Sequence, residues 1–428
     1  MCSVIRHRGP DGAGFARVGD GSTLLGHVRL SIIDLATGAQ PLFNEDHSIA
    51  ITFGGEIYDY QTHRATLIEA GHTFRTQSDT EVIVHLYEEH GLRFLEHLNG
   101  EFAIVIYDDR KKQLVAARDR LGVKPLFFSV SGNELLVASE AKSVLALDRV
   151  SRAISADYLV GTHLGAFPYG GSAFAGIQSV KPGHYVVAKA GSVGEQVPYW
   201  QPRFETRENL SFDEANREVR RLFVAGVRRR LVADVPVGAY LSGGLDSGLV
   251  CATMAALGAG VDRSFRVFNA GFSDPRFDES GLARRIAEHF GASFETIPCG
   301  MADMAEEYEQ TLYHTEMALV NPSAIAKQML SRLVRSQGYK VCLTGEGSDE
   351  VFGGYQYFKQ EAIWRKLLAR EERDEGKQLW KRFTREEKHT EGALWHRGRS
   401  WETEEPWFGY PSFHQMRLEE NSRHALES

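Results

Sequence analysis

The chain has 428 residues, of which 43% are hydrophobic and 25% are charged, a composition that indicates a globular protein and excludes a disordered one. Its length predicts about two to three domains. The formal net charge of -8 argues against nucleic-acid binding as the main function, and the longest uncharged run after residue 247 is too short to cross a bilayer. Neither a nucleic acid nor a membrane is therefore expected as a partner.

Four cysteines are present without a CxxC pair, so neither a disulfide framework nor a zinc site is expected, and a reducing cytoplasm fits best. Cys2 follows the initiator methionine. Removal of Met1 would leave Cys2 with a free α-amine beside its thiol, and such an amine can act as the base that prepares the thiol to attack an amide carbonyl. The alternative is an ordinary cysteine at the chain terminus.

The first half of the chain alternates turn residues with short apolar runs. A turn at 8–12 is followed by a capped helix that begins at Ser78 and ends near His90, and by strands at 23–34, 49–53, 101–107, 114–117, 125–129 and 134–138. Many strands with few helices predict an α+β fold in which two sheets are sandwiched between helices. A glycine-rich segment at 165–176 and a short strand pair near 177–188 are interpreted as the crossing between domains.

An exposed amphipathic helix is predicted at 212–231, and its arginines are expected to form a solvated face. After it, the stretch from Ser242 to Ser247 lies between a buried strand, 235–241, and an apolar helix, 247–257. A glycine-rich strand-to-helix turn binds phosphates, because unpaired N–H groups point out of the first helical turn. No Gly-Lys-Ser/Thr ending is present, and Asp246 indicates a pyrophosphate bridged by a metal ion. A serine-capped glycine turn is the structural alternative.

Strands and helices alternate after this turn, at 264–268, 279–290, 294–297, 302–314, 323–336 and 340–343. This alternation predicts an α/β doubly wound parallel sheet, in which ligands bind at the carboxyl ends of strands. A second glycine and acid cluster, Thr344 to Glu350, also follows a strand, so both loops are predicted to line one crevice. Glu316 and Tyr357 are expected to be structural. A helix is predicted at 360–373, before a mixed-charge tail.

Several motifs occur in the order known from one family: Cys2, 8–12 (RGPDG), 29–34 (RLSIID), 55–58 (GEIY), 78–81 (SDTE) and 117–126 (ARDRLGVKPL). They resemble the class II glutamine amidotransferase domain, which has an Ntn-hydrolase-like αββα fold. Together with the Ser242–Ser247 loop, they resemble glutamine-hydrolysing asparagine synthetase. This resemblance implies an amidotransferase domain at 1–200 and an ATP-pyrophosphatase-type synthetase domain at 201–428, incomplete at its carboxyl end.

The resemblance also implies roles for single residues. Cys2 would release ammonia from glutamine and the Gly55 N–H would stabilise the oxyanion, whereas Arg29 would bind the glutamine carboxylate, and Glu56 and Asp79 its amino group. In the second domain Glu346 would accept a proton from the attacking ammonia. Asp246 and Asp349 would hold Mg²⁺, and the remaining ATP and pyrophosphate residues would be Leu241, Ser242, Gly243, Gly244, Ser247, Val267 and Gly345.

The sequence departs from the family at three places. Gly54 stands where an asparagine usually completes the oxyanion hole, so glutaminase activity is expected to be weak or lost. Ser3 replaces the usual glycine after the cysteine, and the segment that usually precedes the RGPD motif is short, so a remodelled domain or a missing stretch is expected. The family's later serine–glutamate–arginine stretch and catalytic lysine were not found beyond Phe358.

The leading hypothesis is an enzyme that adenylates an acidic acceptor, aspartate, with ATP and delivers glutamine-derived ammonia to it through an internal passage. An amide synthetase of secondary metabolism that acts on another carboxylic acid, with free ammonia as a nitrogen source, is the second hypothesis. A noncatalytic regulator that binds glutamine or nucleotide is the third, and Asp246 and Asp349 argue against it. A homodimer is the assembly considered.

Overall fold

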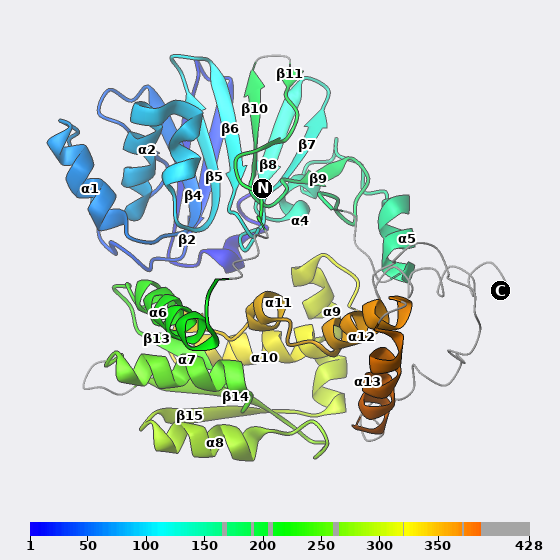
Figure 1. Ribbon diagram of the computed structural model, residues 1–428. Helices are drawn as coiled ribbons and strands as arrows, with labels where there is room; N and C mark the ends of the chain where they lie inside the picture. The colour runs from blue at the N-terminus through cyan, green and yellow to red at the C-terminus, as the bar shows by residue number, and fades with distance from the viewer. Residues whose placement is uncertain are drawn as a thin grey trace. The chain divides into compact units, whose positions relative to one another are not determined.

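The computed structural model describes residues 1–164, 169–189, 192–203, 209–259, 265–319, 321–369 and 372–386. The chain divides into two compact units, Met1–Leu159 with Phe167–Thr344, and Val160–Ala166 with Gly345–Ser428. Figure 1 shows the order of the helices and strands along the chain. None of the described helices combines the length and apolarity that crossing a membrane requires.

The amino-terminal half of the first unit is built around two sheets. Within the described residues, the larger sheet has the order β11-β10-β6-β5-β4-β3, with β12 beside β10, and the smaller has the order β8-β7-β9. The larger sheet consists of β3 (Leu42–Phe43), β4 (Ile49–Ile57), β5 (Gly100–Asp108), β6 (Gln113–Arg118), β10 (His184–Lys189), β11 (Ser192–Val193) and β12 (Val197–Pro198). The smaller consists of β7 (Phe127–Ser131), β8 (Glu134–Ala138) and β9 (Ile177–Ser179). A separate hairpin joins β1 (Gly12–Val18) to β2 (Thr23–Arg29).

Helices cover the outer faces of these sheets. One face of the larger sheet packs against α1 (Tyr60–Glu69), α2 (Asp79–His90) and α3 (Phe94–His97), and Figure 1 shows α1 and α2 beside β4 and β5. Its other face packs against the smaller sheet through a core that contains Ala116, Phe128 and Val186. Beyond the smaller sheet lies α4 (Ala141–Leu145). The predicted αββα sandwich is therefore confirmed.

The carboxyl-terminal half of the first unit has one parallel sheet with the order β15-β14-β13-β16. Its strands are β13 (Val237–Tyr240), β14 (Arg266–Phe272), β15 (Ser293–Cys299) and β16 (Val341–Leu343). One face is covered by α6 (Phe212–Arg230), α7 (Leu245–Ala256) and α8 (Ser280–His289), and the other by α9 (Met301–Thr315) and α10 (Ser323–Ser336). The predicted doubly wound sheet is confirmed, and its strand order reverses between β13 and β16.

The second unit contains α11 (Ser348–Phe352), α12 (Gln356–Leu368) and α13 (Arg373–Glu386). A further helix, α5 (Ala156–Leu164), contains the division between the two units at Leu159. The tail expected after residue 386 lies outside the described residues. The predicted helix at 360–373 corresponds to α12, which begins and ends earlier, and α13 was not anticipated.

Several predicted elements needed correction. The strand expected at 23–34 ends at Arg29, because the chain turns there and Asp34 has a left-handed backbone with φ of 53°. The strand pair expected near 177–188 is wrong: β9 pairs with β7, whereas β10 pairs with β6. The strand β1 was not predicted, and only its first residue, Gly12, lay in the turn expected at 8–12. The helix α1 was missed because Leu67 is its only buried residue among those described.

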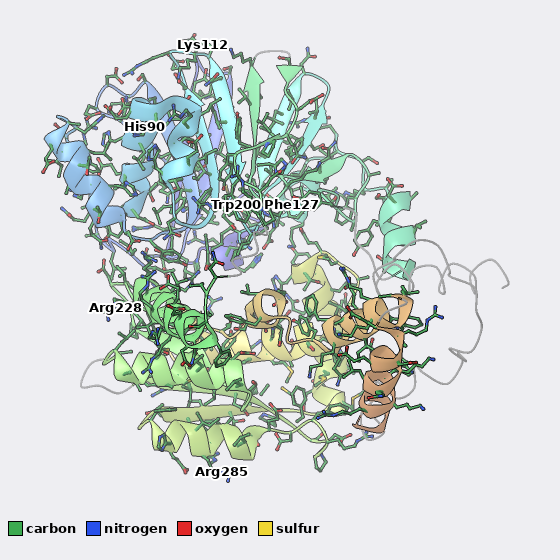
Figure 2. All side chains as sticks on the ribbon, viewed as in Figure 1. His90, Lys112, Phe127, Trp200, Arg228 and Arg285 are labelled. Carbon is green, nitrogen blue, oxygen red and sulfur yellow. The ribbon has the colours of Figure 1, made fainter. Side chains whose placement is uncertain are left out.

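The amphipathic helix α6 begins with a capping box, in which Ser211 Oγ accepts a hydrogen bond from Glu214 N and the Glu214 carboxylate accepts one from Ser211 N. Val227 is its only fully buried residue among those described. Arg228 is exposed on this helix, and Figure 2 labels it. The predicted exposed arginine face is therefore confirmed, except that Arg229 is half-buried and forms an ion pair of 2.6 Å with Asp59. The exposed Arg230 also forms an ion pair, of 3.2 Å, with Glu101.

Polar contacts join the two halves of the first unit. Asp34 N donates to Asp234 Oδ2 at 2.7 Å, and Asp234 N donates to Ile32 O at 3.0 Å. Lys340 Nζ lies 2.6 Å from Asp11 Oδ2 and donates to Ser31 O at 3.1 Å. The loop after β2 is thus bonded to residues that stand just before β13 and β16.

Candidate functional site

A cavity of about 550 Å³ in the amino-terminal half brings together residues that are far apart in the sequence. They come from the first residues of the chain, from β2, from β4 and from the start of α2. The sequence had singled out six of them: Cys2, Arg29, Gly54, Gly55, Glu56 and Asp79. The residues implicated in glutamine binding and hydrolysis thus surround one space, and their chemical roles stay predictions.

Two acids lie in the cavity wall, of which Asp79 is buried and Glu56 is half-buried. Asp79 opens α2, where its carboxylate accepts hydrogen bonds from Ile57 N at 2.9 Å and from Ser78 Oγ at 3.3 Å. Burial nevertheless raises the pKa of Asp79 to about 6. Burial and the charge of Asp79 raise the pKa of Glu56 to about 8. No neighbouring cation is therefore strong enough to keep both carboxyl groups ionised. A bound ammonium group would supply the missing positive charge.

Arg29 provides a positive charge to the same cavity. Its Nη2 donates to Asp34 O at 2.5 Å and to Ile33 O at 3.2 Å, so the loop after β2 fixes the guanidinium. Gly38 is required beside it, because a Cβ there would lie 2.5 Å from Nη2. A cavity that holds one guanidinium and two carboxyl groups matches the carboxylate and ammonium groups of a free amino acid.

The two glycines of β4 have different surroundings. A Cβ on Gly55 would lie 2.0 Å from Glu101 O on the paired strand β5, so only glycine fits there. A Cβ on Gly54 would have no atom within 4 Å. The position at which the family usually has asparagine therefore has room for a side chain.

Cys2 lies against the hairpin. Its Sγ would be 2.7 Å from a Cβ on Gly26, so the glycine of β2 makes room for the thiol. Burial raises the pKa of Cys2, although the amino-terminal charge opposes this rise. While Met1 is attached, the Cys2 nitrogen is an amide and cannot serve as a base, so the nucleophile hypothesis depends on removal of Met1.

Two further cavity residues were missed in the sequence. Gln40 bridges the wall, because its Oε1 accepts from Phe53 N at 2.7 Å and its Nε2 donates to Thr80 Oγ1 at 3.3 Å. Lys124 also lines the cavity, where its charge partly offsets the raised pKa of Glu56. Lys124 lies inside the quoted 117–126 motif, so that motif could have indicated it; no signal in the sequence indicated Gln40.

The Ser242–Ser247 loop connects β13 to α7, beside the place where the strand order reverses. Ser247 Oγ accepts a hydrogen bond from Ser242 N at 3.2 Å and lies 3.0 Å from Ser242 Oγ, and Ser242 Oγ accepts one from Gly244 N at 3.3 Å. Gly243 has φ of 95°, which favours glycine. The loop thus has the strand-to-helix geometry and the switch-point location at which anions bind in such sheets.

Two residues that were predicted to border a nucleotide lie in the core. Leu241 and Val267 are both buried in the hydrophobic core, so the side chain of Val267 packs against helices. Asn269 was missed in the sequence: it is buried in β14, and its Nδ2 donates to Leu241 O at 2.7 Å. A buried asparagine in an otherwise apolar strand was the available signal.

The second glycine and acid cluster has a tightly turned backbone. Gly347 and Gly353 flank the short helix α11 with φ of 92° and 66°, and Gly354 N donates to Asp349 O at 3.0 Å. Gly345, Glu346 and Asp349 belong to the second unit, whereas Asp246 belongs to the first. A shared crevice and a shared magnesium site therefore stay predictions.

Glu316 has the structural role that was expected. It lies at the end of α9, where its carboxylate accepts hydrogen bonds from Ala141 N at 2.7 Å and Lys142 N at 2.6 Å. Lys142 Nζ also lies 3.1 Å from Glu316 and 2.6 Å from Glu140. This buried network joins α4 of the amino-terminal half to α9. The side chain of Tyr357 lies outside the described residues.

Both halves of the chain match known families. Residues 1–200 match the model of the glutamine amidotransferase domain, and residues 218–425 match that of asparagine synthase. The chain therefore joins an amidotransferase domain to an ATP-utilising synthase domain. Over most of its length the chain is also similar to glutamine-hydrolysing asparagine synthetases.

Individual relatives differ in name. The chain is 35% identical to the amidase chry2 of Gibberella zeae, over 88% of this chain and 59% of that protein, and 37% identical to the amidase chyE of Penicillium rubens, over 84% and 55%. It is 37% identical to a glutamine-hydrolysing asparagine synthetase of Sandersonia aurantiaca, over 83% and 62%. The chain thus spans less than two thirds of the length of these relatives.

Among solved structures, the chain is similar to the glutamine phosphoribosylpyrophosphate amidotransferase from B. subtilis. The sequence identity is 20% and the TM-score 0.34, and the match covers 69% of this chain and 61% of that chain.

Proposed function

We propose that this protein is an ATP-dependent, glutamine-hydrolysing amidotransferase that forms asparagine from aspartate and releases AMP and pyrophosphate. The observation that carries the proposal is the cavity in which Arg29 and the Glu56–Asp79 pair line a space large enough for an amino acid, within a domain that matches the glutamine amidotransferase model. The domains are proposed to be 1–200 and 201–428. A cytoplasmic location and a homodimer belong to the same proposal.

In the first proposed reaction, Arg29 binds the glutamine carboxylate, and Glu56 and Asp79 bind its ammonium group. The Cys2 thiolate attacks the side-chain amide carbon, ammonia leaves, and water then hydrolyses the thioester to glutamate. The Gly55 N–H stabilises the oxyanion that forms during each attack. The cysteine α-amine, once Met1 is removed, is the base that accepts the thiol proton.

In the second proposed reaction, an aspartate carboxylate oxygen attacks the α-phosphorus of ATP and pyrophosphate leaves. Ser242, Gly243, Gly244 and Ser247 bind the pyrophosphate, while Leu241, Val267 and Gly345 border the nucleotide. Ammonia then attacks the activated carbonyl carbon, AMP leaves, and Glu346 accepts the proton. The hydroxyls and the first helical turn of α7 support the assignment of the loop.

Asp246 and Asp349 are the proposed holders of Mg²⁺, because carboxylate oxygens are the ligands this ion prefers. Asp246 stands in the first turn of α7, directly after the proposed pyrophosphate loop. The ion would neutralise negative charge on the pyrophosphate group. The chain's own contribution is to bind and orient the phosphates through the loop.

A second candidate function is an amide synthetase that acts on another carboxylic acid. It is favoured by two relatives that carry the name amidase rather than asparagine synthetase. A glycine at position 54, where the family usually has asparagine, is compatible with an enzyme that uses free ammonia. A noncatalytic regulator is the third candidate.

The test measures pyrophosphate released from ATP by the purified chain, with a panel of carboxylic acids and with ammonium or glutamine as the nitrogen source. Release that depends on aspartate supports the proposal. Pyrophosphate release with a different acid, and none with aspartate, would contradict asparagine synthesis and support the second candidate function. The absence of release with every acid, together with measured binding of glutamine or ATP, would favour the regulator.

A further inference from the structure

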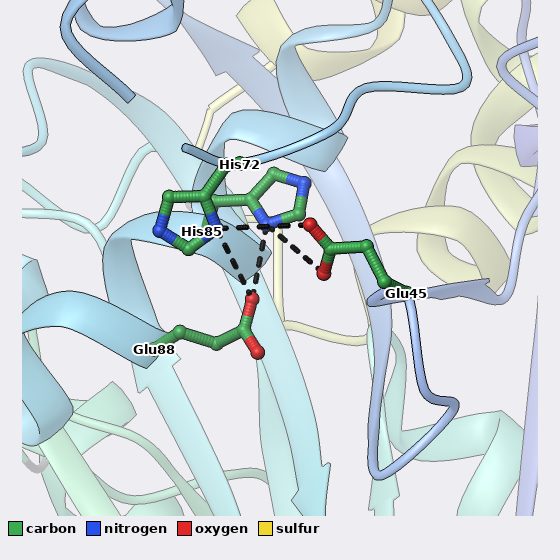
Figure 3. A group of neighbouring side chains, drawn as sticks. All are labelled: Glu45, His72, His85 and Glu88. Carbon is green, nitrogen blue, oxygen red and sulfur yellow. Dashed lines mark hydrogen bonds and ion pairs between the residues drawn. The ribbon is translucent and has the colours of Figure 1, made fainter. Parts of the chain in front are cut away.

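Two histidines and two glutamates lie close together in the amidotransferase half, and none of them lines the cavity described above. Glu45 comes from the turn before β4 and His72 from the turn after α1, whereas His85 and Glu88 lie one turn apart on α2. Figure 3 shows the two imidazole rings side by side, with both carboxylates directed toward them. One ligand atom from each of the four residues lies within 4.8 Å of the others.

The spacing of these atoms suits one shared ion. His85 Nδ1 lies 3.0 Å from Glu88 Oε2, and His72 Nδ1 lies 3.7 Å from the same oxygen. The Glu45 oxygens lie 3.8 Å from His72 Nδ1 and 3.8 Å from His85 Nδ1. Ligands at about 2.1 Å from a tetrahedral ion are about 3.4 Å apart, so small side-chain movements would complete the coordination.

Neighbouring groups hold the outer atoms of Glu88 and His72, and a main-chain amide holds the carboxylate of Glu45. Glu88 Oε1 accepts a hydrogen bond from Asn44 Nδ2 at 2.7 Å, which leaves Oε2 facing the histidines. His72 Nε2 lies 2.9 Å from Glu89 Oε1, which fixes the ring with Nδ1 toward the cluster. Glu45 Oε1 accepts from Thr73 N at 3.0 Å. A carboxylate on the far nitrogen of a histidine is a common partner of metal-binding imidazoles.

His85 supplies an independent observation. Its side chain is 1% exposed, and its Nε2 has no hydrogen-bond partner among the described residues. The nearest acid is Glu81, whose Oε1 lies 4.0 Å away. If the neutral His85 ring carries its proton on Nδ1, the lone pair of Nε2 faces the Glu81 carboxylate without a hydrogen-bond donor between them. A cation on Nδ1 moves the proton to Nε2, where it points toward Glu81.

The local charge also favours a cation. Four glutamates surround the two rings: Glu45, Glu81, Glu88 and Glu89. Arg110 lies 3.7 Å from Glu88 but is bonded more closely to Asp46, at 2.7 Å, and Arg75 bonds the main-chain oxygen of Glu45. A divalent ion with two neutral imidazoles and two carboxylates forms a neutral centre.

We propose that Glu45, His72, His85 and Glu88 form a binding site for a divalent transition-metal ion, with Zn²⁺ as the reference ion. Two imidazole ligands favour Zn²⁺ over Mg²⁺ or Ca²⁺, which prefer oxygen ligands only. Four protein ligands complete a tetrahedral shell, so the site is structural and not catalytic. The ion cross-links the turn before β4, the turn after α1 and the helix α2, whose first turn carries Asp79.

The experiment uses the full chain after treatment with a chelator and its removal. Zn²⁺ is titrated by calorimetry and Co²⁺ by absorption spectroscopy. One ion per chain, with the absorption of tetrahedral cobalt and no sulfur-to-cobalt band, is expected. Saturation at about a hundred times Kd should raise the Tm of the amidotransferase half by about 5–10 °C. Absence of binding, or a sulfur band that assigns the ion to a cysteine, would overturn the proposal.

Variants at the two more accessible ligands keep the test decisive, because replacing the buried His85 risks misfolding. His72→Gln and Glu45→Gln should each weaken Zn²⁺ binding at least tenfold, and reduce the rise in Tm at the same Zn²⁺ concentration by about half or more. His97→Gln is the matched control: His97 is exposed and stacks on His90 in the same domain, with ring centroids 4.1 Å apart. Equal affinity in His72→Gln and His97→Gln would show that the four residues form only a hydrogen-bonded cluster.

Discussion

Side chains supply the charged groups of the amidotransferase cavity, whereas the polar groups of the Ser242–Ser247 loop, apart from the carboxylate of Asp246, are main-chain amides and two hydroxyls. In the cavity, burial moves the pKa values of Glu56 and Asp79 toward neutrality. The amides and hydroxyls of the loop do not titrate in that range. Binding of an amino acid should therefore depend on pH, whereas binding of phosphates through the loop should depend on backbone shape.

The largest expected effect is on the rate of amide formation, and it distinguishes the amidotransferase cavity from the Ser242–Ser247 loop. Cys2→Ala should abolish glutamine-dependent amide formation and preserve the ammonia-dependent reaction, because only the first uses the thiol. Ser247→Ala should lower both reactions by the same factor, about 10²–10³, since it removes a polar group from the proposed pyrophosphate loop. Initial rates with saturating glutamine or ammonium measure both effects.

Cys342→Ser is the thiol control for that experiment, because this half-buried cysteine lies on β16 rather than in the cavity. It should behave as the unaltered chain. Equal loss of both nitrogen sources in Cys2→Ala would contradict a division of labour between the two regions.

The next effect concerns the backbone of the cavity. Gly55→Ala should lower the free energy of unfolding by about 1–3 kcal/mol or more, because its Cβ would lie 2.0 Å from Glu101 O. Gly54→Ala, with no atom within 4 Å of its Cβ, should change it by less than about 0.5 kcal/mol. Chemical denaturation of both variants measures the difference.

The neighbouring position also tests the oxyanion hole. Gly54→Asn should raise the glutaminase rate if the absent side chain limits it, since one such donor contributes about 10²–10³ in rate. An unchanged glutaminase rate in a folded Gly54→Asn variant would show that the absent asparagine side chain does not limit the reaction.

A third prediction uses the pH dependence of the cavity. Glu56 has its pKa raised to about 8, so the folded chain retains a proton that the unfolded chain loses near pH 4. The stability contributed by this proton is complete below pH 4 and is lost as the pH rises toward 8. Glu56→Gln should therefore be more stable than the original chain at pH 9, by about 1–3 kcal/mol, and nearly equal to it at pH 4.

The same variant sharpens the comparison with the loop. Glu56→Gln should raise the KM for glutamine and leave the KM for ATP unchanged. A stability difference that does not vary between pH 4 and pH 9 would mean that Glu56 is ionised in the folded chain.

The smallest expected effect lies beneath the loop. Asn269→Ala removes the hydrogen bond of 2.7 Å to Leu241 O and should cost about 1–2 kcal/mol of stability, with a severalfold higher KM for ATP. Thr296→Val removes only the bond of 3.3 Å to Asn269 Oδ1 and should have a smaller effect on both quantities. A KM for ATP that is unchanged in Asn269→Ala would separate Leu241 from nucleotide binding.

Much of the fold could be predicted from local patterns. The Ser78 cap and the apolar run after it gave α2, and the alternation of strands and helices gave the parallel sheet. The strand pairing could not be predicted, because β9 and β10 are close in sequence but join different sheets through contacts with residues far away in the chain. The helix α1 was missed because a nearly solvated helix has no apolar stripe.

The sequence motifs indicated the residues of the candidate glutamine site, but they did not indicate the residues that support this site. Arg29, Glu56 and Asp79 stand in recognisable stretches, and the cavity unites them. Gln40 and Asn269 hold backbone groups of residues distant in sequence, so only the folded chain reveals their partners. The cluster of Glu45, His72, His85 and Glu88 was missed for the same reason, since its residues come from separate segments of the chain that only folding brings together.

The loop after β2 has a consequence for how the two halves respond to each other. Its carbonyls at Ile33 and Asp34 hold the guanidinium of Arg29, while Ser31 and Asp34 are bonded to Lys340 and Asp234. Lys340 directly precedes β16, and Asp234 stands three residues before β13. The loop that fixes Arg29 is therefore also hydrogen-bonded beside the starts of both strands that flank the reversal in strand order, so only a few residues separate the candidate glutamine site from the parallel sheet.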